Sequence, residues 1–130
     1  MRDQLGRPIV HLELRTNDPA RSCAFCVRAF GWRAETIRAG SGSYLALGRG
    51  TGIEVGVVDG DSGRGWLPYV EVADVYTATE LVRQLRGSVV LAPREGPAGW
   101  RSVIVEPCGA EIGLWQPKPY RLNIGRNLRC

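Results

Sequence analysis

Four side chains suited to proton transfer or metal binding stand at matched places in the two halves of this 130-residue chain. His11 lies in the segment PIVHLELR, and Tyr69 lies 58 residues later in LPYVEV. Glu54 lies in GIEVGVV, and Glu111 lies 57 residues later in AEIGLWQ. Imidazole nitrogen and carboxylate oxygen bind zinc, manganese, iron or nickel without choosing among them. The same groups could instead transfer protons without a metal.

Two copies of one βαβββ unit are predicted to position these residues. Residues 8–58 form the first unit, and its elements are expected at Pro8–Arg15 (strand), Asp18–Gly31 (helix), Trp32–Arg38, Ser43–Leu47 and Gly52–Val58 (strands). Residues 66–116 form the second, with elements expected at Leu67–Ala73 (strand), Asp74–Gly87 (helix), Ser88–Ala92, Trp100–Val105 and Ala110–Gln116 (strands). A linker, residues 59–65, separates the units, and a tail, residues 117–130, follows.

The two helices have matching boundaries. Asp18 and Asp74 are suited to cap the free N–H groups of a first turn, and Gly31 and Gly87 to end the helix. Thirteen residues separate cap from glycine in both copies. Such agreement indicates an internal duplication, and it predicts an α+β fold.

Strand alternation places the candidate residues on one face of each sheet. The opposite face is apolar and is expected to lie under the helices. Gly52, Gly56 and Gly113 leave space above the polar face, so this face is predicted to be the floor of a pocket. Ligand contacts are expected from Glu13, Trp66, Glu71, Trp100, Arg101 and Trp115.

Composition argues against several function classes. The net charge is +4, and the basic residues are scattered without interleaved aromatics, so nucleic-acid binding is not expected. No apolar run could cross a bilayer and no secretory signal is seen, so a cytoplasmic protein is expected. Cys23 and Cys26 form a C-x-x-C inside the first predicted helix, where we interpret them as packing residues rather than redox thiols.

The segments PIVHLEL, AFGW and AEIGLWQP, together with the paired units, resemble the vicinal oxygen chelate superfamily. The resemblance covers roughly residues 8–117. It implies a single glyoxalase-like domain, with a curved mixed sheet around a central cleft. It also implies a homodimer. In metal enzymes of this superfamily the ligands come from the first and last strands of each unit, which here carry His11, Glu54, Tyr69 and Glu111.

Tyr69 departs from that pattern, because His or Gln is usual there and the pKa of a phenol, about 10, makes it a poor ligand. Two hypotheses follow. In the first, a metal-free protein binds a hydrophobic or aromatic metabolite, sequestering it or assisting its conversion, as bleomycin-resistance proteins and their relatives do. In the second, His11, Glu54 and Glu111 hold one divalent metal for a lyase or isomerase reaction, with Tyr69 or Glu111 moving a proton. A mixed case, acid–base catalysis by His11 with Glu54, also stands.

Overall fold

The computed structural model describes residues 6–39, 42–48, 52–60 and 64–119. Its elements are β1 (Ile9–Thr16), α1 (Pro19–Phe30), β2 (Ala34–Ala39), β3 (Gly42–Leu47), β4 (Glu54–Asp59), β5 (Gly65–Glu71), α2 (Val75–Gln84), β6 (Ser88–Glu95), β7 (Gly99–Val105) and β8 (Glu111–Pro117). The predicted α+β class and the repeated βαβββ order are confirmed. Parts of the predicted linker and tail lie outside the described residues.

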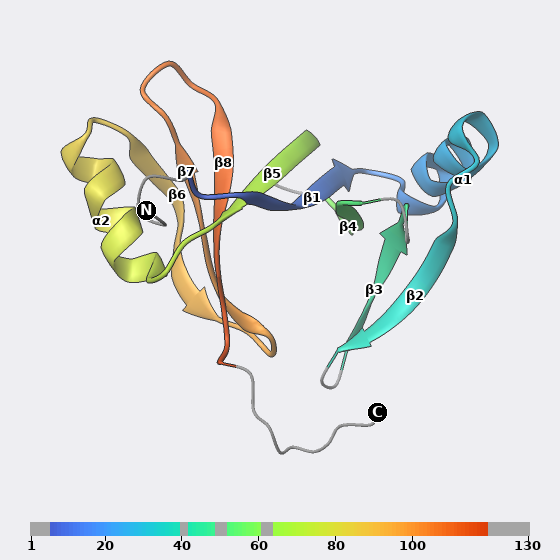
Figure 1. Cartoon of the computed structure of the whole chain (residues 1–130). Coiled ribbons are helices and arrows are strands. Elements are labelled where there is room, and N and C mark those ends of the chain that lie inside the picture. Colours follow the sequence, from blue (N-terminus) through green and yellow to red (C-terminus); the bar gives the residue numbers. More distant parts are fainter. Residues whose placement is uncertain (1–5, 40–41, 49–51, 61–63, 120–130) are drawn as a thin grey trace.

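All eight strands belong to one open, mixed sheet in the order β2-β3-β4-β1-β5-β8-β7-β6. Within each unit the first strand pairs in parallel with the last, β1 with β4 and β5 with β8. The antiparallel pair β1/β5 joins the two units at the centre of the sheet. Figure 1 shows β1 and β5 crossing between the two halves, with α1 and α2 at opposite sides of the molecule.

Both helices begin as the sequence predicts. The Asp18 carboxylate accepts a hydrogen bond from the Arg21 backbone N–H, and Pro19 occupies the first helical turn. The Asp74 carboxylate accepts from two backbone N–H groups in the same way. Gly31 ends α1 in the left-handed conformation, with φ of 72°.

The predicted end of the second helix is wrong in detail. α2 ends at Gln84, and Arg86 rather than Gly87 takes the left-handed conformation, with φ of 75°. Gly87 is needed for a different reason. A Cβ there would lie 2.6 Å from a Val82 methyl carbon and 2.8 Å from the Val105 carbonyl oxygen, so the chain can pass only without a side chain.

Apolar side chains form two clusters between the helices and the sheet. One joins Cys23 and Cys26 of α1 to β3 and β4, and the other joins Val75 of α2 to β7 and β8. We call the sheet face away from the helices the open face. A third cluster of Leu67, Tyr69 and Val103 lies there, so in the second unit the face predicted to be polar is partly apolar core.

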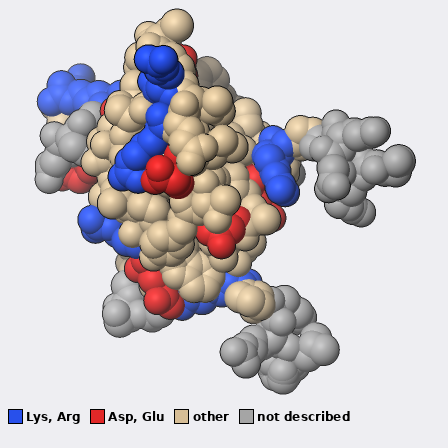
Figure 2. Space-filling view, turned by 90° about the vertical axis from the view of Figure 1, so that its left-hand side faces the viewer, with Lys and Arg blue, Asp and Glu red and all other residues tan. Residues whose placement is uncertain are grey.

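The surface carries charges of both signs. On the side of the molecule where α2 lies, Figure 2 shows basic and acidic side chains interspersed. Within the described residues, neither helix has the length and apolar character needed to cross a bilayer.

Candidate functional site

Three of the four predicted site residues meet at the centre of the open face. His11 on β1 lies opposite Glu54 on β4 and opposite Tyr69 on β5. The imidazole and phenol rings make an edge contact, with centroids 5.7 Å apart. These side chains come from the central β1/β5 pair and its neighbour, so the seam between the two units positions them.

Glu111 is not part of this group. Gly113, not Glu111, lies opposite Tyr69 in the β5/β8 pair. Tyr69 follows His11 by 58 residues and Gly113 follows Glu54 by 59, so the structural equivalent of Glu54 is Gly113. The sequence alignment of the two closing strands, which matches Glu54 to Glu111, is therefore wrong by two residues.

The two glycines predicted to leave space above the sheet do so for aromatic rings of the protein itself. A Cβ on Gly113 would overlap the ring of Tyr69, which lies directly above it. A Cβ on Gly56 would lie 3.2 Å from Nε2 of His11. By contrast, Gly52 has nothing within 4 Å and a φ of 109°, so its role is in a turn.

Glu111 forms an ion pair with a residue that sequence reasoning did not assign to it. The Arg15 Nη1 atom donates to Glu111 Oε1 across the open face. The same guanidinium donates to the backbone carbonyls of Gly65 and Arg64, at 3.4 and 3.3 Å. The two side chains are only 14% and 29% exposed, so this pair is partly protected from solvent screening.

The Tyr69 hydroxyl joins a cation to a carboxylate. Arg101 Nη1 donates to it at 2.7 Å, and it lies 3.4 Å from Glu13 Oε1, to which it donates. Burial and the nearby Glu13 carboxylate raise the pKa of Tyr69, while the Arg101 guanidinium opposes that shift. The phenol is therefore neutral near pH 7, and as a neutral group it is a poor metal ligand.

His11 is held in its neutral form. Burial lowers its pKa, and the carboxylates of Glu13 and Glu54 oppose the shift without reversing it. Tyr44 on β3 donates a hydrogen bond to Glu54 at 3.4 Å. Sequence reasoning missed Tyr44, although its alternation with Ala46, which pairs with Gly56, was a usable signal.

The lowered pKa of His11 predicts a measurable pH dependence of stability. The unfolded chain binds a proton on His11 below its ordinary pKa of about 6.5, whereas the folded chain resists it. The free energy of unfolding should be largest above pH 6.5, fall as the pH drops below it, and level off beneath the folded pKa. Urea unfolding between pH 5.5 and 7.5 measures this.

His11→Gln provides the matched comparison. His11 is the only histidine in the chain, so the variant should lack the component of the slope between pH 6 and 7 that the wild type shows. An identical slope in both proteins would show that His11 is not desolvated in the native state.

The predicted metal set is not assembled on the open face. Within the described ranges, no three His, Cys, Asp or Glu side chains are grouped so that they could hold a metal ion. His11 and Glu54 face each other, but Glu111 is displaced along β8 and is neutralised by Arg15. The arrangement therefore does not fit the three-ligand site expected from the sequence.

The predicted ligand-contact residues divide between the two faces. Strand alternation places Glu13, Glu71, Arg101 and Trp115 on the open face, where Trp115 packs on the apolar cluster. Trp100 packs in the cluster under α2. Trp66 lines a cavity on the helix side, against α1.

The C-x-x-C cysteines lie in the core. Cys23 and Cys26 are 6% and 4% exposed, and burial raises the pKa of both thiols. A raised thiol pKa lowers the thiolate population, so both groups have the character of small apolar side chains.

Comparison with known proteins identifies the fold. No protein-family model matches the chain, and no curated protein matches it. A hypothetical protein from Bacillus halodurans C-125 superposes with a TM-score of 0.66 at 11% identity, covering 92% of this chain and all of that one. A methylmalonyl-CoA epimerase variant from Streptomyces coelicolor in complex with 2-nitronate-propionyl-CoA gives 0.61 at 15%, covering 86% and 95%. The Mycobacterium tuberculosis methylmalonyl-CoA epimerase gives 0.60 at 16%, covering 85% and 88%.

Proposed function

The chain has the fold of the vicinal oxygen chelate superfamily, and we propose that it uses the open face to bind a small aromatic metabolite without a metal. The observation that carries this proposal is the commitment of the polar groups around His11. Arg15 is paired with Glu111, and Arg101 is bonded to Tyr69. The neutral imidazole is left as the group suited to recognise a ligand.

The ligand chemistry follows from these groups. A neutral imidazole has one ring nitrogen that accepts a hydrogen bond, which suits a hydroxyl group on the ligand. Trp115 lies opposite Arg101 in the β7/β8 pair and offers an aromatic surface on the same face. The proposed ligand is therefore a hydroxylated aromatic molecule, sequestered on this face or held there for conversion.

A closely matched pair of probes tests the hydroxyl contact. We expect 2-naphthol to bind about fivefold more tightly than 2-methoxynaphthalene, which lacks the donor, because a neutral hydrogen bond contributes about 1 kcal/mol. Isothermal titration calorimetry on protein purified without a polyhistidine tag measures both affinities. In His11→Phe the two affinities should become equal.

Two tryptophan variants locate the binding face. Trp115→Leu should weaken both probes, whereas Trp66→Leu, on the helix side, should leave the preference for naphthol unchanged. Equal preference in wild type and His11→Phe would refute the proposal. So would about one equivalent of divalent metal lost in both His11→Ala and Glu54→Gln, which would instead support the metal-dependent lyase or isomerase.

A second candidate function is favoured by the direct opposition of His11 and Glu54. A neutral imidazole beside a carboxylate can accept a proton, because the carboxylate stabilises the imidazolium that forms. In that case the bound molecule would exchange an acidic hydrogen with solvent. Deuterium incorporation into the ligand that is lost in both His11→Gln and Glu54→Gln would support conversion over sequestration.

A further inference from the structure

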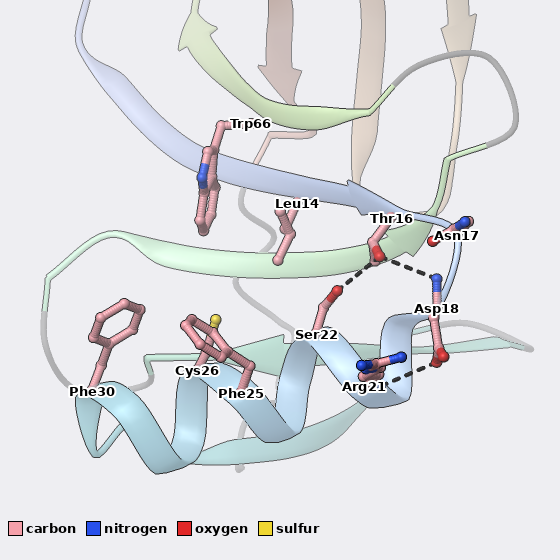
Figure 3. A pocket seen from close by; sticks show the side chains of 10 residues that line it. All are labelled: Leu14, Thr16, Asn17, Asp18, Arg21, Ser22, Phe25, Cys26, Phe30 and Trp66. Carbon is pink, nitrogen blue, oxygen red and sulfur yellow. Dashed lines mark hydrogen bonds between the residues drawn. The ribbon is translucent and has the colours of Figure 1, made fainter.

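A second candidate site lies on the helix side of the sheet, away from the open face. A cavity of about 710 Å³ separates α1 from the ends of β1 and β5 (Figure 3). We call it the α1 groove, and it is lined by Leu14, Thr16, Asn17, Asp18, Arg21, Ser22, Phe25, Cys26, Phe30 and Trp66. Its volume is within the range of about 300–1,000 Å³ that small-molecule sites occupy.

Aromatic rings form the two walls of the α1 groove. Trp66 projects from β5 on one side, and Phe25 and Phe30 stand on α1 across from it (Figure 3). Their exposed fractions, 46%, 63% and 56%, are large for such side chains. Phe30 makes ring contacts with both Phe25 and Trp32, at 5.9 and 5.1 Å between centroids, so this wall is supported from behind.

The groove stays open because neither helix covers this part of the sheet. α1 packs mainly on β1, β3 and β4, and α2 packs mainly on β6, β7 and β8. The outer face of the β5 end that carries Trp66 therefore lies between them. A planar molecule placed there would have an indole ring on one side and phenyl rings on the other, the arrangement that aromatic stacking favours.

One end of the groove is polar and carries an uncompensated cation. Thr16 and Ser22 bond to each other, and the Asp18 carboxylate is held by the backbone N–H of Arg21. Among the described residues, no carboxylate lies within 4.0 Å of the Arg21 guanidinium. Its donors are free for an anionic group of a ligand.

The second unit shows that the fold itself does not require these residues. Three and seven positions after the cap, α1 has Arg21 and Phe25, whereas α2 has Thr77 and Leu81. The shallower hollow beside α2 is lined by Tyr76, Thr77, Glu80, Leu81 and Gln84. The unit repeats its cap there without the basic residue or the facing tryptophan.

We propose that the α1 groove is a binding site for a small aromatic anion, independent of the site proposed on the open face. The ring would lie between Trp66 and Phe25, and the anionic group would reach Arg21. Charge argues against a second copy as the occupant through paired α1 helices. Arg21 and the exposed Arg28 lie on nearly the same side of the helix, and antiparallel pairing about Phe25 would bring them against their like-charged counterparts.

The test compares two probes that differ in the anionic group. 8-Anilinonaphthalene-1-sulfonate carries a sulfonate, and N-phenyl-1-naphthylamine is the same ring system without it. We expect the sulfonate to bind the full chain at one saturable site by fluorescence titration. Arg21→Gln should weaken the sulfonate about fivefold and leave the uncharged probe unchanged, while Phe25→Ala should weaken both about tenfold.

Matched controls come from the other helix and the other face. Arg83→Gln and Tyr76→Ala on α2 should change neither probe, and Arg101→Gln on the open face should leave the sulfonate affinity unchanged. Near-ultraviolet circular dichroism identical to wild type shows that a variant is folded. Equal losses of both probes in Arg21→Gln would overturn the proposal. A dimer by light scattering that becomes a monomer in Phe25→Ala would also overturn it, because a second copy would then cover the groove.

Discussion

Gly113→Ala is expected to lower the free energy of unfolding by about 3 kcal/mol, the upper part of the range for inserting a methyl group into a packed core. The new Cβ would overlap the ring of Tyr69. That ring cannot move aside easily, because Tyr69 is 4% exposed and its hydroxyl is bonded to Arg101 and Glu13. Urea unfolding followed by tryptophan fluorescence measures the loss.

Gly96→Ala is the control for this prediction. A Cβ at Gly96 would have as its nearest listed neighbour the Gly99 carbonyl oxygen at 3.7 Å, an ordinary contact, and its φ is not in the left-handed region. The control should therefore change stability by less than about 1 kcal/mol, and a small gain is compatible with reduced freedom of the unfolded chain. If Gly113→Ala proved equally mild, Tyr69 would not lie over Gly113, and the register that matches Glu111 to Glu54 would be restored as the better description.

Arg15→Met is expected to lower the free energy of unfolding by about 2 kcal/mol at pH 7. The substitution keeps the length of the side chain but leaves the Glu111 carboxylate, which is 29% exposed, without its cation. It also removes the donors to the Gly65 and Arg64 carbonyls. Near pH 4 the loss should be smaller, because the orphaned carboxyl can then take up a proton.

A double-mutant cycle separates the ion pair from the other contacts of Arg15. Arg15→Met combined with Glu111→Gln should recover part of the loss, since no charge is then left unpaired. The surface pair Arg83–Glu80 serves as a control, with side chains 52% and 56% exposed. Arg83→Met should change stability by less than about 0.5 kcal/mol. Independent, additive effects of the Arg15 and Glu111 substitutions would show that the two residues do not interact.

The sequence predicted the elements of the fold well because the relevant signals are local. Each helix begins at an aspartate whose carboxylate accepts backbone N–H groups within three residues. The strands follow from alternation of apolar and polar residues, and their bounds differ by a few residues from the prediction. The fold class then follows from finding the same order of elements twice.

The candidate site was only partly predictable, because alternation fixes a face but not a position along it. Moving a strand by two residues returns every side chain to the same face, so the pattern cannot distinguish Glu111 from Gly113 as the partner of Tyr69. The actual register depends on long-range contacts such as the packing of the Tyr69 ring. His11 and Glu54 were correctly expected together, since their pairing does not involve this shift.

The central β1/β5 pair has a consequence for how the chain folds. β1 takes its hydrogen-bonding partners from β4 and β5, and β5 takes its partners from β1 and β8, all far along the chain. Closing such long loops lowers the entropy of the chain before many contacts have formed, which makes folding slow. Each unit also leaves its first strand with an unpaired edge until the other unit is in place. The two halves are therefore expected to unfold in a single cooperative transition, and a chain cut between them should expose a strand edge prone to aggregation.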